Sequence, residues 1–207
     1  MSIPRIGWND CWGSVLEALS PFKIPCMRFT GAFWGQCMQR ALEQCVADDL
    51  DWILTIDYDS MFTSKHLDAM FAHFGQNPKI DALAALQCRR TEGFPLMTVM
   101  GSKEVEVKAG EPILVTTAHF GLTLLRVERL KQLEKPWLWA KPDDEGSWGD
   151  NRLDDDIWFW HQWRKSGGTI YVAPDVRIGH LEVMVSQFTP DMKAEHIHVN
   201  EWRNQNK

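Results

Sequence analysis

The chain has 207 residues, of which 44% are hydrophobic and 24% are charged, and its 22 basic and 28 acidic side chains give a net charge of −6. These proportions are typical of one globular domain with a sizeable core, and they exclude a disordered or fibrous chain. No apolar run approaches the roughly 20 residues that span a bilayer, and the first residues lack the pattern of a secretory signal. We therefore expect a single cytoplasmic domain without integral membrane association.

The cysteines and the net charge exclude further classes. No two of the five cysteines have the C-x-x-C spacing, which predicts free, buried thiols rather than a disulfide framework or a zinc site. An acidic chain also lacks the clustered Lys and Arg on which nonspecific nucleic-acid binding depends. The eleven Trp residues suit a core and a ligand-stacking surface equally well, so their number decides nothing.

Short apolar runs alternate with segments of helical period, which predicts an α/β fold. In the first half, the pattern predicts a strand at 5–8, a helix at 33–46, a strand at 52–56, a helix from about 63 to 75 and a strand at 82–86. In the second half, it predicts a small β insertion within 91–115 that covers a sheet edge, a strand at 118–125, helical turns at 127–133, a long loop at 135–151, a helix from about 154 to 165 and a strand at 169–172. The residues after His180 show no strong pattern.

The pair Asp57 and Asp59 is the strongest candidate for a functional site. Three D-x-D pairs occur in the chain, but only this one directly follows an apolar strand, and ligands of open α/β sheets bind at the carboxyl ends of strands. In extended geometry, residues i and i+2 point to the same side, so both carboxylates can face one hard cation. The alternative is a turn that caps the next helix.

Two further groups carry candidate chemistry. Asp154, Asp155 and Asp156 precede an aromatic-rich helix. Carboxylates there are favoured by the helix dipole alone, but one of them can also serve as a general base toward a hydroxyl group. His180 follows the last predicted strand, where a histidine is either a hydrogen-bonded structural residue or a ligand for an ion such as Mn²⁺.

These groups belong to a series of short motifs in a set order: Asp57-Tyr58-Asp59, His119 to Arg126, Lys135-Pro136-Trp137, Asp155 to Phe159, Ile170 to Pro174 and Gly179-His180. The series resembles that of GT-A glycosyltransferases, most closely the glycosyltransferase family 2-like proteins, including small forms encoded by phages and prophages. The resemblance covers roughly residues 3–181.

The resemblance implies one Rossmann-like GT-A domain over 1–207, with a mostly parallel central sheet flanked by helices and a small β insertion. Its nucleotide-binding half would occupy about 1–90, its acceptor and catalytic half about 91–181, and its C-terminal tail 182–207. If the chain is phage-encoded, its expected location is the host cytoplasm.

The resemblance also assigns roles residue by residue. It implies Mn²⁺ or Mg²⁺ as cofactor, with Asp57, Asp59 and His180 as metal ligands. Asp155 and Asp156 would form the catalytic acidic pair, with Asp156 as the base that deprotonates the acceptor. The expected contacts to a UDP- or GDP-sugar donor are Trp8, Asn9, Asp10, Gln36, Arg40, Asp57 and Tyr58.

The predicted activity is metal-dependent transfer of a sugar from a nucleoside diphosphate sugar. We expect Trp137, Trp139 and Trp148 of the long loop either to stack on a sugar or base or to pack the loop onto the body. The acceptor stays open between a glycan, a protein and a modified phage DNA base, and inversion or retention is also undecided. Two alternatives are a catalytically inert sugar- or nucleotide-binding phage module and a metal-dependent nucleotidyltransferase. The second is disfavoured because Arg5 is the only basic residue near the first loop.

Overall fold

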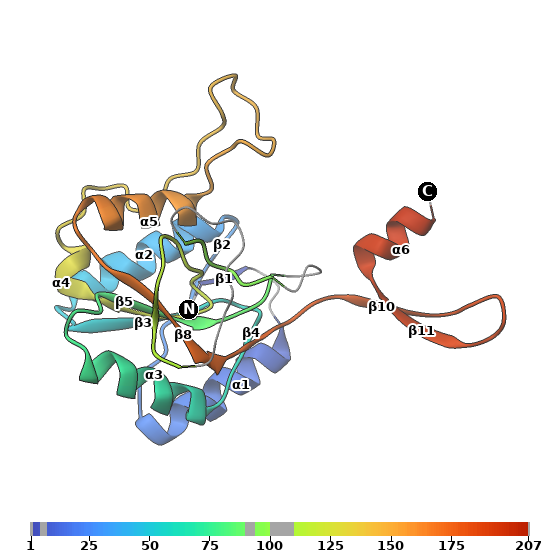
Figure 1. Cartoon of the computed structure of the whole chain (residues 1–207), viewed down its shortest axis with the longest axis horizontal. Helices are drawn as coiled ribbons and strands as arrows, with labels where there is room; N and C mark the ends of the chain where they lie inside the picture. The colour runs from blue at the N-terminus through green and yellow to red at the C-terminus, as the bar shows by residue number, and fades with distance from the viewer. Residues whose placement is uncertain (1, 5–7, 90–93, 100–109, 207) are drawn as a thin grey trace.

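A five-stranded sheet with helices on both faces forms the body of the protein in the computed structural model (Figure 1). The structure describes residues 8–89, 94–99 and 110–206, together with the backbone of 2–4. Most of the predicted strand at 5–8 and much of the predicted β insertion lie outside these residues. None of the helices in the described part of the chain is long and apolar enough to cross a membrane.

The described elements follow one another in this order: β1 (Ser2–Pro4), α1 (Asn9–Leu19), η1 (Ser20–Phe22), β2 (Phe29–Gly31), α2 (Trp34–Ala47), β3 (Trp52–Ile56), β4 (Ser60–Met61), α3 (Ser64–Gln76), β5 (Ala82–Leu86), β6 (Ile113–Leu114), β7 (Leu122–Arg126), α4 (Val127–Leu130), α5 (Asp155–Lys165), β8 (Ile170–Arg177), β9 (Gly179–His180), β10 (Met184–Phe188), β11 (Ala194–His198) and α6 (Val199–Gln205). The predicted helices and strands between 33 and 86 are confirmed, as are those at about 154–165 and 169–172. The predicted strand at 5–8 does not extend to its expected end, because Trp8 directly precedes α1, which begins at Asn9.

The sheet is mostly antiparallel, so the expectation of a mostly parallel Rossmann-like sheet is wrong. Its strand order is β3-β7-β5-β8-β6, and only the β5–β8 pair is parallel. The strands β3, β5 and β8 run in one direction, while β7 runs in the opposite direction between β3 and β5. In the described part of 87–121, no helix returns the chain to the start of the sheet, so β7 begins at the edge where β5 ends. The strand β6 forms one edge of the sheet.

Alternate side chains of the central strands build two cores, one on each face of the sheet. On β5, Ala82 and Ala84 pack toward α2, α4 and α5, whereas Leu83 and Ala85 pack toward α1 and α3. Figure 1 shows the corresponding layers, with α2, α4 and α5 on one side of the sheet and α1 and α3 on the other. Strands that are buried on both faces explain the continuous apolar runs in the sequence.

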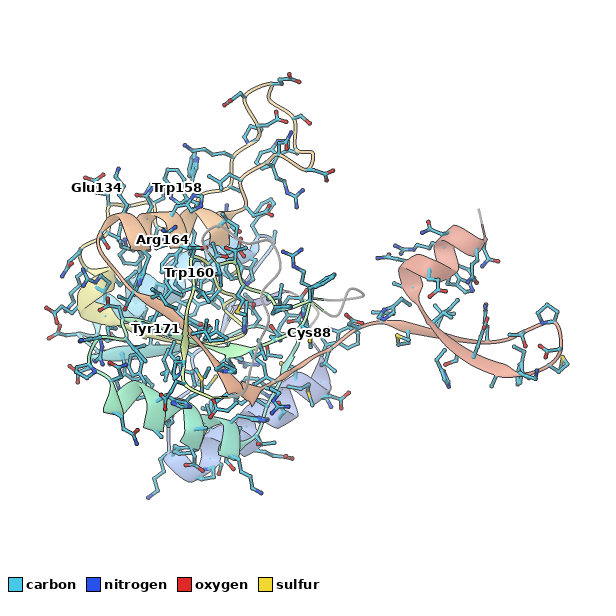
Figure 2. The ribbon with its side chains drawn as sticks, viewed as in Figure 1. Cys88, Glu134, Trp158, Trp160, Arg164 and Tyr171 are labelled. Carbon is cyan, nitrogen blue, oxygen red and sulfur yellow. The ribbon has the colours of Figure 1, made fainter. Side chains whose placement is uncertain are left out.

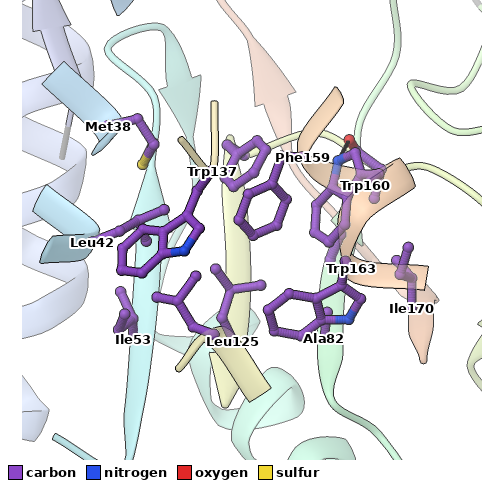
Figure 3. Close-up of a cluster of buried hydrophobic side chains, with 14 of the residues drawn as sticks. Met38, Leu42, Ile53, Ala82, Leu125, Trp137, Phe159, Trp160, Trp163 and Ile170 are labelled. Atoms are coloured by element: carbon purple, nitrogen blue, oxygen red, sulfur yellow. Dashed lines mark hydrogen bonds between the residues drawn. The ribbon is translucent and has the colours of Figure 1, made fainter. Parts of the chain in front are cut away.

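Stacked and edge-to-face aromatic rings fill the core beneath α5 (Figure 3). The ring centroids of Phe120 and Trp160 lie 5.0 Å apart, and those of Phe159 and Trp163 lie 5.5 Å apart. The indole N–H of Trp163 donates to the Thr169 carbonyl oxygen at 3.1 Å, so this buried ring also has its polar atom satisfied. Most tryptophans of α5 therefore serve the core.

The tryptophans of the loop at 135–151 and the cysteines differ in their exposure. Of the two roles expected for the loop tryptophans, Trp137 has the packing role, because it is only 2% exposed and lies in this same core, whereas Trp139 and Trp148 are exposed. All five cysteines are free, as expected. Cys88 is exposed, however, which contradicts the prediction that the thiols are buried.

Residues 183–206, which we call the C-terminal arm, extend away from the body (Figure 1). The arm consists of the antiparallel pair β10–β11 and the short helix α6. The sequence showed no strong pattern here because none of these residues is buried, so no apolar period marks the elements.

The core on the two faces of the sheet predicts that alanine substitutions at two leucines differ strongly in their effect on stability. Leu124 on β7 is fully buried, and Leu114 on β6 is 57% exposed. We expect Leu124→Ala to lower the free energy of unfolding by about 2–5 kcal/mol, because it leaves a cavity. Leu114→Ala serves as the control and should change it by less than about 0.5 kcal/mol. Urea unfolding followed by circular dichroism measures both, and equal effects would contradict the described core.

Candidate functional site

Four chain segments bring polar side chains to one edge of the sheet. Asp57 directly follows β3, Gln87 follows β5 and His180 lies beyond β8, all at the carboxyl ends of strands that run in the same direction. His119 precedes β7, which runs the opposite way, so it lies at the same edge. This edge is where α/β proteins place their ligands.

The short pair β4–β9 joins two of these segments. Ser60 pairs with His180 and Met61 with Gly179, and the Leu181 N–H donates to the Asp59 carbonyl oxygen at 2.8 Å. As a result, Nε2 of His180 lies 3.4 Å from Oδ2 of Asp59. Both side chains are largely buried, with exposed fractions of 14% and 5%. The predicted convergence of these two residues is therefore present in the structure.

A backbone carbonyl determines which nitrogen of His180 carries the proton. Nδ1 lies 2.9 Å from the Cys88 carbonyl oxygen, which can only accept a hydrogen bond, so Nδ1 is the donor. In the neutral ring, Nε2 then presents its lone pair toward the Asp59 carboxylate. A ring N–H bonded to a backbone carbonyl also occurs in histidines that bind metals through their other nitrogen.

A tryptophan binds the carboxylate of Asp57. The indole N–H of Trp34, the first residue of α2, donates to Oδ1 of Asp57 at 2.7 Å. Among the described residues, no group of three or more His, Cys, Asp or Glu side chains is arranged to hold a metal ion. The predicted three-ligand set is thus not grouped in this structure. Asp59 and His180 remain as adjacent donors.

The acidic pair lies where the beginnings of two helices meet. Asp155 and Asp156 open α5, and the Asp155 carboxylate accepts hydrogen bonds from the backbone N–H groups of Asp156 and of Gly35, near the start of α2. The Asp156 carboxylate accepts the Ile157 N–H at 2.7 Å. Each carboxylate therefore accepts hydrogen bonds from N–H groups that lack a partner within the helix, at a helix start where the dipole favours negative charge.

Burial raises the pKa of three carboxyls in this cluster. Desolvation, together with the nearby Asp156, raises the pKa of Asp57 to about 6 against the lowering effect of the Trp34 hydrogen bond. Desolvation likewise raises the pKa of Asp156 to about 6, with a contribution from Asp155. The pKa of Asp155 is also raised, mainly by burial. Perturbed carboxyls in one cleft are typical of functional sites.

These groups line a cavity of about 330 Å³. Its lining residues are Trp34, Asp57, Tyr58, Asp59, Gln87, Leu96, His119, Phe120, Asp154, Asp155, Asp156 and His180. Five of them are aspartates and, among the described residues that line the cavity, none is Lys or Arg. The cavity therefore attracts cations and repels a bare diphosphate. A larger cavity of about 490 Å³ between α2 and β3 is mainly apolar and contains no comparable cluster of carboxylates and imidazole.

The other predicted donor contacts do not line this cavity. Trp8 precedes α1, and Asn9 and Asp10 are exposed in its first turn. Gln36 and Arg40 are exposed on α2. Polar residues of α2 that do reach another segment include Gln39, whose side-chain oxygen accepts the N–H groups of Trp137 and Leu138, and Glu43, which pairs with Lys135 at 2.8 Å.

Sequence reasoning missed the roles of Trp34 and His119. Trp34 lies in the predicted helix at 33–46, and nothing local indicates that its indole reaches Asp57. His119 belonged to a quoted motif but received no role. Its Nε2 donates to the Ala85 carbonyl oxygen at 2.7 Å and its Nδ1 accepts the Gly121 N–H at 2.9 Å. Burial lowers its pKa to about 4, so it is a neutral structural residue at pH 7.

Comparison with solved structures includes a match that shows a shared fold. No protein-family model matches the sequence. No curated protein shows significant sequence similarity to it. A197 from STIV superimposes with a TM-score of 0.61 at 16% identity, over 93% of this chain and 90% of that one. At this identity, the likeness shows a shared fold alone.

Two further solved structures superimpose more weakly. GalNAc-T7, solved with UDP, GalNAc and Mn²⁺, gives a TM-score of 0.47 at 14% identity over 74% of this chain, which spans 32% of that protein. A mycobacterial protein gives 0.49 at 11% identity, over 95% of this chain and 82% of that one. Both TM-scores are below 0.5, so neither match shows a shared fold.

The contact between the two helix starts predicts opposite effects of alanine at two helical glycines. A Cβ on Gly35 would lie 2.0 Å from Oδ2 of Asp155, whereas one on Gly13 in α1 meets nothing within 4 Å. We expect Gly35→Ala to displace the Asp155 carboxylate and to lower the free energy of unfolding by about 1–3 kcal/mol. Gly13→Ala, the control, should raise it by up to about 1 kcal/mol through helix propensity. Denaturant unfolding measures both, and a stabilising Gly35→Ala would contradict the described contact.

The raised pKa values predict how stability depends on pH. Asp57 and Asp156 hold their protons more tightly in the folded chain than in the unfolded one, whose carboxyls titrate near pH 4. Their contribution therefore lowers stability as pH rises from about 4 to about 6, and is constant above that. Asp156→Asn should remove on the order of 2 kcal/mol of this loss.

The measurement is the free energy of unfolding of each variant across this pH range. Asp144→Asn, in the exposed loop, is the control and should leave the slope unchanged. An unchanged slope in Asp156→Asn would show that this carboxyl titrates normally.

Proposed function

We propose that this protein is a metal-dependent glycosyltransferase of GT-A type that transfers a sugar from a nucleoside diphosphate sugar to an acceptor. The observation that carries the proposal is the placement of Asp59 against His180 in the same acidic cavity as Asp57 and Asp156. The order of the sequence motifs, which resembles that of GT-A glycosyltransferases, is consistent with it. The cavity lies at the strand ends where such a donor would bind.

The donor set fits a cation that the substrate helps to hold. A carboxylate and an imidazole nitrogen suit Mn²⁺ or Mg²⁺, and two protein ligands are enough where substrate phosphates complete the coordination. Asp59 and His180 would hold this ion, with the Cys88 carbonyl fixing the orientation of the imidazole. When bound, the cation would neutralise the charge of the leaving diphosphate. An acidic cavity without Lys or Arg in its described lining needs such a counterion to accept a diphosphate.

The remaining acidic residues divide between chemistry and positioning. Asp156 is the candidate base, because a carboxyl with a pKa near 6 is largely ionised at pH 7 and still basic enough to accept a hydroxyl proton. Asp155 positions it, since the Asp155 carboxylate binds N–H groups of both helix starts. Asp57, oriented by Trp34, faces the donor. The exposed Trp139 and Trp148 lie in the loop that leads into α5 and offer faces for an acceptor.

Nucleotide binding should depend on Mn²⁺ through Asp59. We expect UDP or GDP to bind the wild-type chain at least tenfold more tightly with Mn²⁺ than without it, and Asp59→Asn to remove about this tenfold gain. Titration calorimetry with each nucleotide measures it. Asp49→Asn, an exposed aspartate outside the cavity, is the control. Metal-independent binding, or binding that Asp59→Asn leaves unchanged, would contradict the proposal.

Measuring turnover and nucleotide binding separately tests whether Asp156 acts in the reaction or in binding. Hydrolysis of the nucleoside diphosphate sugar in a coupled assay should fall by about 10²-fold or more in Asp156→Asn, while calorimetric binding of the nucleotide persists. Asp144→Asn, an exposed aspartate outside the cavity, is the control and should leave turnover unchanged. Binding without turnover in the wild-type chain would identify a binding module instead of an enzyme.

A further inference from the structure

The C-terminal arm is organised internally but has no core of its own. The helix α6 folds over one face of the hairpin, where the Trp202 indole N–H donates to Oε1 of Gln187 at 2.8 Å. His198 and Glu182 pair at 3.1 Å at the base. None of the residues 183–206 is buried, and Figure 2 shows the side chains of the arm projecting on both sides of the hairpin, away from the body. A two-stranded hairpin without a core is marginal in water, so the arm needs a partner.

The hydrogen bonds at the two ends of the hairpin show which backbone groups face outward. The Val199 N–H donates to the Val183 carbonyl oxygen at 3.3 Å, and the Thr189 N–H donates to the Lys193 carbonyl oxygen at 2.9 Å. In an antiparallel pair, bonded and outward-facing residues alternate, so the odd-numbered residues of β10 bond to β11. The N–H and C=O groups of Met184, Ser186 and Phe188 therefore form the outer edge of β10.

The outer edge of β10 lacks the features that normally keep an edge strand from pairing with another strand. The strand β10 reads Met184 to Phe188 without a charge or a proline, and its sheet contains only two strands among the described residues. Met184 is 45% exposed and Phe188 is 68% exposed. Both share with Ser186 the face opposite α6, because side chains alternate between faces and Gln187 contacts α6. A neutral, apolar edge of this kind favours pairing with another strand.

The edge is complementary to itself. Antiparallel pairing of two β10 strands about a two-fold axis at Ser186 brings together the outward-facing groups of both copies in the register of a continuous ladder. Met184 then faces the partner's Phe188, and Phe188 faces the partner's Met184, which are favourable sulfur–aromatic pairs. No like charges oppose one another, because Glu182 falls opposite the partner's Pro190. The outer edge of β11 is less suitable, since it presents two histidines, His196 and His198.

We propose that the chain forms a homodimer in which β10 pairs with β10 of a second copy, giving a four-stranded sheet β11-β10-β10-β11. The pairing bonds the outer edges of the two β10 strands and brings Met184 and Phe188 of the two copies into lateral contact on the face opposite α6. It places the two bodies at opposite ends of the shared sheet. The proposed dimer depends on the edge and side chains of the arm and is independent of the chemistry assigned to the cavity.

Proline tests the edge without breaking the hairpin. Ser186→Pro removes an outward N–H that β11 does not use, and edge positions tolerate proline. His196→Pro is the matched control, because it places proline at the paired outward position of β11 and removes the same Ser186–His196 hydrogen bond. Size-exclusion chromatography with light scattering over about 1–100 µM protein should show dimers for the wild-type chain and His196→Pro, and dissociation at least tenfold greater for Ser186→Pro. A monomeric wild-type chain, or an equally dimeric Ser186→Pro, overturns the proposal.

Charge pairs test the register and remain decisive if both prolines unfold the hairpin. The double variant Met184→Lys/Phe188→Lys opposes like charges across the two-fold axis and should be monomeric, as should Met184→Glu/Phe188→Glu. An equimolar mixture pairs opposite charges at both positions and should form a 1:1 heterodimer. A mixture that stays monomeric, or double variants that dimerise separately, overturns the assignment.

Discussion

The pairing of β4 with β9 is the contact on which the candidate site depends. It joins the segment after β3 to the segment after β8, so that Asp59 and His180 meet although they are far apart in the sequence. The pairing is possible because β3, β5 and β8 run in the same direction and end at one edge. A ladder of two residues has little stability alone, and the core on each face of the sheet holds it in place.

The cavity concentrates negative charge where two helices begin. N–H groups at the starts of α2 and α5 stabilise Asp155 and Asp156, while the Trp34 indole stabilises Asp57. These bonds offset only part of the cost of burial, which is why the pKa values of the carboxyls are raised. The site therefore contains negative charge poised to be neutralised by a proton or a cation. This property links the electrostatics of the cavity to the proposed activity.

The body and the C-terminal arm differ in what stabilises them. The body buries apolar side chains on both faces of its sheet, whereas the arm buries none and exposes Met184 and Phe188. Hydrogen bonds across the hairpin order the arm, but they contribute little net stability when both partners can also bond to water. The described part of the body leaves Met184 and Phe188 exposed. The proposed pairing with a second copy would bring these side chains into contact.

The sequence by itself determined the helices and strands from 33 to 86 and singled out Asp57, Asp59, Asp156 and His180, because apolar period and carboxylates next to an apolar run are local patterns. Only the tertiary structure decided that β7 reverses the sheet, that Asp57 binds Trp34 and that Trp137 is buried. Strand direction and side-chain partners depend on contacts between residues distant in the sequence, and no local period records them. The hairpin of the arm was missed for a related reason, since its strands bury neither face and so show no apolar alternation.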